Sequence, residues 1–314
     1  MAERGPVLLV LRALGLGDLL AGVPALRALR RSHPGHRIVL AAPACLEPLA
    51  RLSGAVDAVA DARLGRALPP GLHGADLAVN LHGRGPESHR TLLATGPRRM
   101  VSFHNPEVPE SAGGPRWRAE EHEVVRWCRL LDESGIPADP SELDLRPPEI
   151  PVERRARGAT LIHPGAASPA RRWPAERWAA VARAERESGR EVLLTGGPGE
   201  VELARRVART AGLPEGCVYA GRTGLLELAA LVAAAGRVLC GDTGVAHLAT
   251  ALGTPSVVLF GPVSPRLWGP PPERERHRAL WAGKSGDPHA ATPDAGLLEI
   301  GVGDVLEAIG ELPR

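Results

Sequence analysis

The sequence of 314 residues has almost no lysine, few aromatic side chains and little net charge. Lys284 is the only lysine, and six Trp, two Phe and one Tyr leave little material for stacking on bases. The 38 basic residues barely outnumber the 36 acidic ones, which gives a formal net charge of +2. Because nucleic-acid binders normally carry a strong basic excess, we expect no nucleic-acid partner.

Long apolar runs and paired cysteines are also missing. The longest apolar run, Leu228 to Gly236, is far shorter than the roughly 18 to 20 residues that a membrane-spanning helix needs. The four cysteines are widely spaced and include no CxxC pair, so they fit neither a disulfide framework nor a zinc site. We therefore expect reduced thiols in a cytoplasmic protein.

Short apolar runs alternate with amphipathic stretches along the whole chain, which predicts an α/β fold with parallel sheets. The expected strands are 7–11, 37–41, 55–59, 75–81, 159–163, 191–195, 238–241 and 256–260. The expected helices are 18–31, 47–52, 120–134, 175–188, 200–211, 225–234, 242–252 and 302–311.

A proline-rich segment divides this pattern. Residues 136–152 contain five prolines, a density that no regular element tolerates. We predict a hinge there, between an N-terminal domain of residues 1–150 and a C-terminal domain of residues 151–314. Ligands of open parallel sheets bind at the carboxyl ends of the strands, so we expect a ligand cleft between the two sheets.

The first motif with chemistry runs from Leu11 to Asp18. A strand ends in a turn with Gly15 and Gly17, where positive φ angles would let another molecule approach the backbone. Asp18 opens the next helix, and an N-cap role worth about 1 kcal/mol is the structural alternative to a functional one. The spacing is not that of a GxGxxG dinucleotide motif.

The second motif, residues 240–247, also joins a strand to a helix. Backbone N–H groups and the helix dipole at such a turn favour a phosphate group, and Thr243 adds a hydroxyl donor. The structural alternative is that Asp242 caps the helix. His247, taken alone, is typical of a packed, hydrogen-bonded histidine.

The third motif, residues 163–174, follows a strand with a loop of small residues and two adjacent arginines, Arg171 and Arg172. Guanidinium groups suit a diphosphate, although a solvated basic loop would have the same sequence.

The fourth motif, residues 196–200, places Glu200 at the start of a helix. A carboxylate there can bind a ribose diol, or it can simply complement the helix dipole.

Together, in this order, the four motifs resemble the bacterial heptosyltransferases, the ADP-heptose:lipopolysaccharide transferases of glycosyltransferase family 9. The resemblance extends through Pro24–Arg30, Ala251–Pro255, Phe260–Pro262 and Trp268–Pro270. It implies a GT-B fold of two Rossmann-like domains, with the acceptor bound by the first and the nucleotide sugar by the second.

The resemblance also implies roles for individual residues. Asp18 matches the proposed catalytic base, and Arg171 stands where the family often has a lysine for the donor phosphates. Glu200 matches an acid that holds the nucleotide ribose. The donor-phosphate turn comprises Asp242, Thr243, Gly244 and His247.

One departure concerns the donor loop. Ala166 and Ala167 occupy positions where relatives often carry Ser or Thr for the phosphate, and Ser168 would take that part. Candidates on the acceptor side are Gly17, His82 and Arg84, with His89 beside them, and residues 102–118 would help to shape that site. Solvated loop residues are the alternative interpretation for these histidines and this arginine.

The expected reaction is inverting sugar transfer from a nucleoside-diphosphate donor, ADP-linked by resemblance, to a glycan or glycolipid acceptor in cell-envelope synthesis. No Asp-x-Asp triplet of the kind that holds Mn²⁺ or Mg²⁺ occurs, so we expect neither a metal nor another cofactor. A lipid-linked acceptor would imply transient contact with the inner face of the membrane. A nucleotide-sugar 2-epimerase of the same fold and a non-catalytic nucleotide-sugar-binding paralogue remain alternatives.

Overall fold

A computed structural model describes residues 5–313. The chain divides into two compact units, the first ending at Leu143 and the second beginning at Asp144. This division falls inside the proline-rich segment 136–152, which contains no regular helix or strand. Within residues 5–313, none of the helices has the length and apolar character required to cross a membrane.

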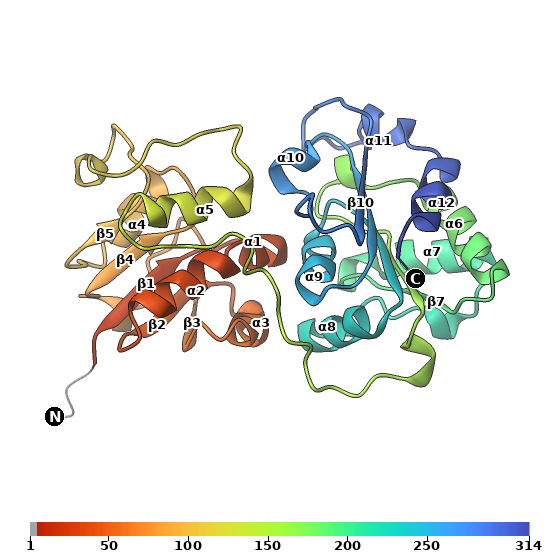
Figure 1. The fold of residues 1–314 in the computed structure, drawn as a ribbon, viewed down its shortest axis with the longest axis horizontal. Helices are drawn as coiled ribbons and strands as arrows, with labels where there is room; N and C mark the ends of the chain where they lie inside the picture. Colours follow the sequence, from red (N-terminus) through yellow and green to blue (C-terminus); the bar gives the residue numbers. More distant parts are fainter. Residues whose placement is uncertain (1–4, 314) are drawn as a thin grey trace. The chain divides into compact units, whose positions relative to one another are not determined.

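The first unit is an open parallel sheet with strand order β3-β2-β1-β4-β5 (Figure 1). Every strand pair in it is parallel, and β1 lies in the centre between β2 and β4. Its elements are β1 (Val7–Leu11), α1 (Leu16–Ala21), α2 (Val23–Ser32), β2 (Arg37–Ala42), α3 (Glu47–Leu52), β3 (Ala58–Asp61), β4 (Leu77–Asn80), α4 (Glu87–Leu93), β5 (Met100–Val101) and α5 (Glu123–Asp132).

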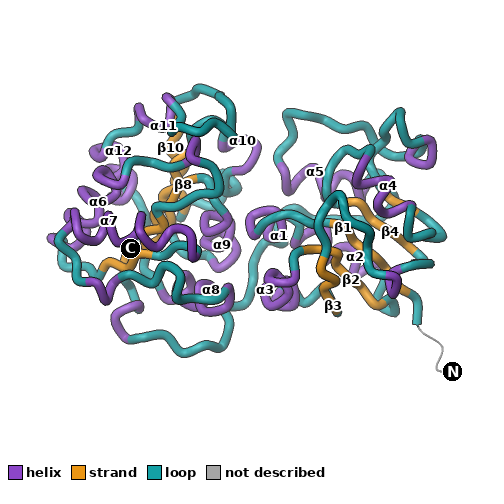
Figure 2. The backbone as a smooth tube through the Cα atoms, turned by 180° about the vertical axis from the view of Figure 1, so that it is seen from behind, coloured by secondary structure: helices purple, strands orange, loops and turns teal. Residues whose placement is uncertain are grey.

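The second unit repeats this plan with strand order β10-β9-β8-β6-β7, again parallel throughout. Helices α8 and α9 lie on one face of its sheet, and α6, α7 and α12 lie on the other (Figures 1 and 2). Its elements are β6 (Thr160–His163), α6 (Ala175–Glu187), β7 (Val192–Leu194), α7 (Val201–Ala211), α8 (Leu225–Ala234), β8 (Arg237–Gly241), α9 (Gly244–Leu252), β9 (Ser256–Phe260), α10 (Pro265–Trp268), β10 (His277–Trp281), α11 (Ala295–Glu299) and α12 (Val302–Gly310).

The central strands are apolar on both sides, as expected for a parallel sheet covered on two faces. Leu9 and Leu11 of β1 pack in a cluster with Leu92 of α4. Successive side chains of a strand point to opposite faces, and the intervening Leu8 and Val10 are also fully buried. The apolar side chains of β1 are therefore buried on both faces of the sheet.

The predicted elements are recovered with shifted ends, except for the helix predicted over residues 18–31. That helix is two, α1 and α2, because the chain turns at Gly22. A Cβ atom at Gly22 would lie 3.1 Å from Cδ and Nε of Arg12, so this glycine leaves room for the arginine side chain to pass. The sequence patterns did not predict α4, β5, α10, β10 or α11, which are short or lie in proline- and glycine-rich stretches.

The four cysteines are free thiols, as the spacing predicted. Cys128, Cys217 and Cys240 are buried, and Cys45 is exposed. Burial raises the pKa of the Cys217 thiol to about 11, so this thiol stays protonated at neutral pH.

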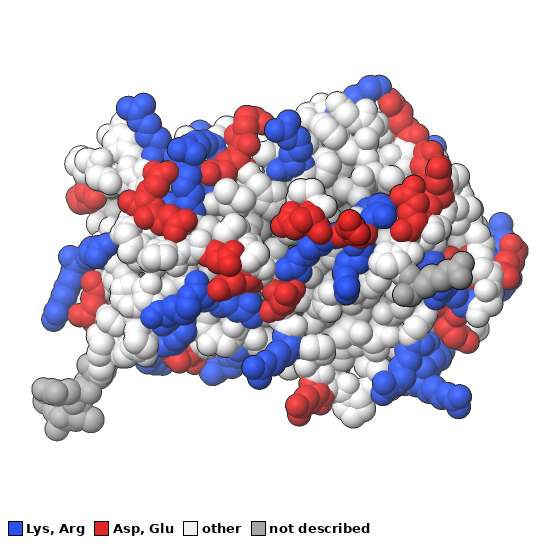
Figure 3. All heavy atoms as spheres, viewed as in Figure 1, with Lys and Arg blue, Asp and Glu red and all other residues white. Residues whose placement is uncertain are grey.

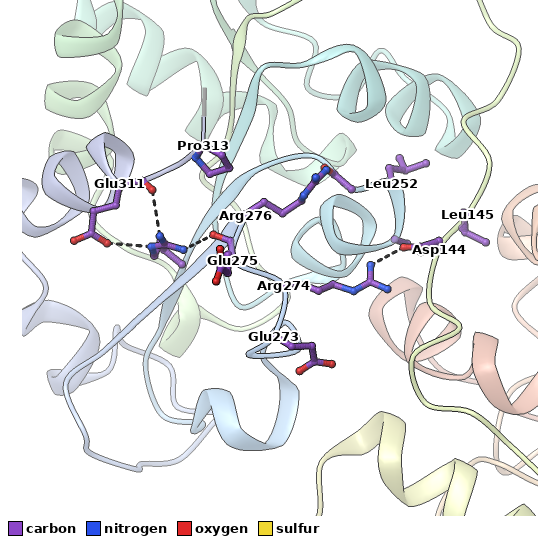
Figure 4. A pocket seen from close by; sticks show the side chains of 12 residues that line it. Asp144, Leu145, Leu252, Glu273, Arg274, Glu275, Arg276, Glu311 and Pro313 are labelled. Carbon is purple, nitrogen blue, oxygen red and sulfur yellow. Dashed lines mark hydrogen bonds and ion pairs between the residues drawn. The ribbon is translucent and has the colours of Figure 1, made fainter.

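An open pocket of about 860 Å³ lies where strands β9 and β10 of the second unit begin. It is charged rather than apolar, and Figure 4 shows Arg274 reaching across to Asp144. Arg276 donates to the Gly253 carbonyl at 2.7 Å. The arginine side chains of this pocket are thus engaged in holding chain segments together.

The buried His277 beside this pocket makes the stability of the fold depend on pH. Burial, together with Arg274 and Arg276, lowers its pKa to about 4. Its Nδ1 atom lies 2.8 Å from Oγ of Ser256. The unfolded chain, with a histidine pKa near the ordinary 6.5, binds more protons than the native state between these two values. The contribution of His277 is therefore complete above pH 6.5 and decreases as the pH falls toward 4.

We expect His277→Asn to weaken this pH dependence, because asparagine retains a polar atom for Ser256 and does not titrate. The wild-type free energy of unfolding should fall by about 3 kcal/mol more than that of the variant between pH 6.5 and 4. Urea unfolding at a series of pH values measures this difference. His73→Asn, at an exposed position, is the control and should follow the wild type. Parallel curves for wild type and His277→Asn would contradict the expectation.

Candidate functional site

In the second unit, three of the sequence motifs follow β6, β7 and β8, so they share the carboxyl edge of one parallel sheet. The pocket described above lies at the opposite, amino edge. Ligands of open α/β sheets bind at the carboxyl edge. The motifs therefore lie where the topology favours a ligand.

The structure brings Arg171 and Asp242 together from two different motifs. Nη1 of Arg171 lies 3.6 Å from Oδ2 of Asp242 and 3.5 Å from its carbonyl oxygen. The Asp242 side chain is largely buried, whereas a quarter of the Arg171 side chain is exposed. The ion pair fixes the guanidinium beside the start of α9 and leaves part of it accessible. Such a cation can pair with the oxygens of a diphosphate.

The start of α9 lies at the same edge, and the first N–H groups of a helix have no partner within the helix. Thr243 is its N-cap in extended conformation, with no capping hydrogen bond from its side chain, and Gly244 is the first helical residue. The cap is therefore Thr243, so the structural alternative in which Asp242 caps the helix is not realised. His247 lies one turn further on, and its ring packs edge-to-face on Trp268 with centroids 5.9 Å apart. The N–H groups of a helix N-terminus, a hydroxyl and a cation together favour an anion.

Glu200 and His163 form a second pair at this edge. Oε2 of Glu200 accepts the Gly197 N–H at 2.7 Å and lies 3.6 Å from Nε2 of His163. Nδ1 of His163 lies 3.1 Å from the Thr195 hydroxyl. Burial lowers the pKa of His163, although the Glu200 charge opposes this shift. Glu200 thus caps the 3₁₀ turn Pro198–Glu200 that leads into α7, and 18 % of its side chain is exposed.

We expect Gly165→Ala to disturb this carboxylate. A Cβ atom at Gly165 would lie 2.1 Å from Oε1 of Glu200, so the carboxylate would have to move. If Glu200 holds the ribose of a nucleotide, the variant should bind ADP more weakly by about tenfold, the value of one lost hydrogen bond to a charged group. Isothermal titration calorimetry measures this, with Gly199→Ala as the control, because a Cβ atom there meets no other atom within 4 Å. Unchanged affinity in Gly165→Ala would contradict the expectation.

Ser168 is buried, and its hydroxyl is engaged in the loop itself. Its Oγ accepts the Ala170 N–H at 3.3 Å and lies 3.4 Å from the Ala290 carbonyl, to which it donates. These bonds give Ser168 a structural role in shaping the loop that ends at Arg171. A direct contact of Ser168 with a donor phosphate stays a prediction.

In the first unit, Asp18 occupies the third position of helix α1 rather than its N-cap. Oδ2 of Asp18 accepts the N–H of Gly15, the N-cap residue, at 3.1 Å. A quarter of the side chain is exposed, and Oδ1 lies 3.8 Å from Nη2 of Arg12. The carboxylate therefore stabilises the helix start and is at the same time accessible and beside a cation.

The two glycines before Asp18 do not take the positive φ angles that the sequence suggested. Gly15 has a φ of −82°, and Gly17 lies inside α1. That expectation was wrong, because the turn is closed by the capping carboxylate of Asp18 in ordinary backbone conformations. Gly17 keeps its place next to Asp18 as a candidate for the acceptor side.

The acceptor-side candidates separate into different environments. His82 lies near Asp18, half-buried, and its Nδ1 accepts the Ala13 N–H at 3.1 Å. Burial first and Arg12 second lower the pKa of His82, while Asp18 opposes the shift. Arg84 is exposed. His89 is fully buried, with Nδ1 2.9 Å from Asn80 and Nε2 2.6 Å from the Phe103 carbonyl. The expectation of a solvated loop histidine was wrong for His89, because α4 carries it into the core.

The sequence motifs missed two buried charged residues beside Asp18. Arg12 is 1 % exposed and contacts Asp18, and Glu123, at the start of α5, is 5 % exposed and binds Arg12 at 3.1 Å. The available signal was an arginine directly after the central apolar strand, where a charge needs a partner. Its partner is 111 residues away, which local patterns do not reveal.

Two further observations concern ions and surface charge. Among residues 5–313, no three His, Cys, Asp or Glu side chains are grouped so that they could hold a metal ion. Basic and acidic side chains are interspersed on the face shown in Figure 3, in keeping with the small net charge.

Comparison with known proteins relates this site to one family. The sequence model of the family described as "Glycosyltransferase family 9 (heptosyltransferase)" matches residues 116–293. This range contains the Arg171, Glu200 and Asp242 motifs but not Asp18. Lipopolysaccharide heptosyltransferase 2 of Escherichia coli K12 is 26% identical over 305 residues, which cover 84% of this chain and 85% of that protein. Lipooligosaccharide heptosyltransferase 2 of Haemophilus influenzae is 29% identical over 168 residues. This match spans 47% of the chain and about half (49%) of that relative.

Solved structures agree on the fold. E. coli heptosyltransferase WaaC with ADP superposes with a TM-score of 0.72 at 19% identity, covering 97% of this chain and 99% of that one. The predicted α/β fold of GT-B type, with two Rossmann-like parallel-sheet domains, is thereby confirmed. Since the family description matches more than half of its length, the chain belongs to glycosyltransferase family 9, the heptosyltransferases, and is a glycosyltransferase.

Proposed function

We propose that this glycosyltransferase moves a heptose from ADP-heptose to a glycan or glycolipid acceptor, with inversion at the anomeric carbon and without a metal ion. The observation that carries the proposal is the shared carboxyl edge of the second sheet. There Arg171, Asp242 and the start of α9 lie together in a chain of this family. ADP is supported by its presence in the structure of the related WaaC.

The second unit would bind the donor. Arg171, which stands where relatives often carry a lysine, would pair with the diphosphate, and the N–H groups at Thr243 and Gly244 would add hydrogen bonds. Glu200 would accept hydrogen bonds from the ribose hydroxyls. The leaving ADP gains negative charge as its bond to the sugar breaks. Fixed hydrogen-bond donors and a cation would stabilise that charge. Such electrostatic stabilisation of the transition state is usually the largest single contribution to catalysis.

The first unit would bind the acceptor and supply the base. The Asp18 carboxylate would take the proton of the acceptor hydroxyl while the hydroxyl oxygen attacks the anomeric carbon and ADP leaves from the opposite side. His82, Arg84 and Gly17 are the proposed acceptor-side neighbours. A lipid-linked acceptor would bring the enzyme transiently to the inner face of the membrane.

A scan of nucleotide sugars by thermal denaturation tests the donor assignment. A ligand that binds only the folded chain raises the melting temperature, by about 2.7 kcal/mol of added stability at one hundred times its Kd. We expect ADP-heptose and ADP to stabilise the protein and the corresponding UDP and GDP sugars to have little effect. Stabilisation by a UDP sugar alone would refute the ADP assignment and leave the transferase class intact.

Metal independence is tested by transfer in the presence of EDTA. Arg171 and the α9 N-terminus would supply positive charge to the leaving diphosphate, so we expect unchanged initial rates of ADP release after dialysis against EDTA. Addition of Mg²⁺ or Mn²⁺ should not raise the rate. A loss of activity that only a divalent cation restores would show that the proposal is wrong on this point.

A further inference from the structure

Arg12 is a fully buried cation at the end of the central strand of the first unit. Its side chain is 0 % exposed, and all three guanidinium nitrogens have partners. Nε donates to the Asp18 carbonyl oxygen at 2.5 Å, Nη1 donates to the carbonyl oxygen of Leu81, and the guanidinium carbon lies 5.0 Å from the Trp127 ring centroid. The arginine therefore joins the start of α1 to the end of β4.

Glu123 is the carboxylate that compensates this cation. Nη2 of Arg12 lies 3.1 Å from Oε1 of Glu123 and 3.8 Å from Oδ1 of Asp18, so one nitrogen is shared between two carboxylates. Trp127 donates to the same Oε1 atom at 2.7 Å, and Arg126 pairs with Oε2. Burial alone would raise the pKa of Glu123, but Arg12, Trp127 and Arg126 together hold it below its ordinary value. Glu123 is thus ionised in the interior.

We propose that Arg12 and Glu123 act as a positioning pair for Asp18, with Arg12 fixing its carboxylate and Glu123 limiting how strongly that cation weakens it as a base. A cation within about 4 Å favours the charged form of a carboxylate, which makes proton uptake harder. A carboxylate on the far side of the cation offsets part of this effect. This inference rests on the proposed role of Asp18 as the base.

The remaining groups around Asp18 do not supply this balance. The Gly15 N–H is a neutral donor. His82 is held largely neutral, because burial and Arg12 lower its pKa. The charge of Glu87 partly offsets the lowering of the His82 pKa. Arg126 pairs with Glu123 from the same helix, α5. Arg12 is therefore a cation 3.8 Å from the Asp18 carboxylate, and Glu123 is the acid bound to that cation.

Two substitutions should shift the pH profile of kcat/KM in opposite directions. In Glu123→Gln the Arg12 charge acts on Asp18 without compensation, so the acidic limb should move to lower pH by about one unit. The plateau rate should fall about three- to tenfold because the base is weaker. In Arg12→Met the acidic limb should move to higher pH. Arg12→Lys, which keeps the charge, should leave the limb near its wild-type position and lower kcat through lost orientation.

Glu121→Gln is the matched control. Glu121 is two residues from Glu123 and its side chain is also largely buried, but it pairs with Arg129 instead of Arg12. The control should leave the acidic limb of the pH profile unmoved and lower only the melting temperature. Glu123→Gln behaving like Glu121→Gln, with reduced stability and an unchanged profile, would overturn the positioning role.

A second readout does not require activity. The side-chain carboxyl ¹³C resonance of Asp18, assigned by its loss in Asp18→Asn, should titrate at lower pH in Glu123→Gln and at higher pH in Arg12→Met. Identical titrations in all variants would refute the pair even if transfer is impaired. Displaced titrations together with full transfer by Asp18→Asn would uphold the pair and reject the proposed base.

Discussion

Replacing Asp18 with asparagine is expected to lower the rate of sugar transfer by about 10²- to 10⁴-fold, the usual value of a general base. Asparagine keeps the shape of the side chain and an oxygen that can accept the Gly15 N–H, so helix α1 should keep its start. It cannot take a proton from an attacking hydroxyl. Because the motifs proposed to bind the donor belong to the second unit, the affinity for ADP should stay close to that of the wild type.

Two measurements separate these effects. Initial rates of ADP release in the presence of acceptor report the chemical step, and calorimetric titration with ADP reports donor binding. Asp61→Asn is the control, since Asp61 ends β3 at the carboxyl edge of the same sheet and also accepts a backbone N–H, that of Ala44. The control should keep normal transfer. Normal turnover in Asp18→Asn would remove this residue from the role of base.

Loss of Arg171 should weaken donor binding and slow the step in which the diphosphate leaves the sugar. In Arg171→Met the cation beside Asp242 is gone, and a buried carboxylate loses its ion-pair partner. We expect the KM for the donor to rise about 10- to 100-fold, since charge-assisted hydrogen bonds contribute about 1.5 to 3 kcal/mol each. The value of kcat should fall as well, because the charge of the leaving ADP grows in the transition state.

Arg171→Lys distinguishes a need for charge from a need for the guanidinium shape. Lysine keeps the positive charge, so the lysine variant should recover most of the donor affinity. Arg183→Met is the control, because Arg183 lies on α6 and donates to the Thr210 carbonyl, away from the motif. A donor KM in Arg171→Met equal to that of the control would mean that Arg171 does not contact the donor.

Much of the architecture followed from local patterns, for physical reasons. The alternation of apolar runs with amphipathic stretches is what a parallel sheet covered on two faces requires, and it located β1, β2, β9 and their neighbours. It misplaced the break at Gly22, because the cause is the side chain of Arg12 from another segment. It missed β10, a five-residue edge strand that contains one arginine, Arg278, and ends in a tryptophan, because its short sequence has no clear apolar run.

The candidate site was predictable where a strand ends and a helix begins. Those turns carry chemistry that is visible in five to ten consecutive residues, as at Asp18, Glu200 and Asp242. The pairing of motifs was not visible, because Arg171 meets Asp242 from 71 residues away. His89 was misjudged for the same reason: its partner carbonyl at Phe103 comes from a separate segment. The local sequence shows which chemical groups are present at a turn. Which of these groups contact one another depends on the tertiary fold.

The central claim is that this chain transfers a sugar from ADP-heptose to a hydroxyl acceptor. The most direct measurement follows ADP release and the mass of a lipopolysaccharide-core acceptor in the same reaction. We predict that each ADP formed is matched by one acceptor that has gained one heptose, and that ADP release is slow when the acceptor is left out. ADP release without any gain in acceptor mass, or binding of ADP-heptose without turnover on any acceptor tried, would contradict the claim.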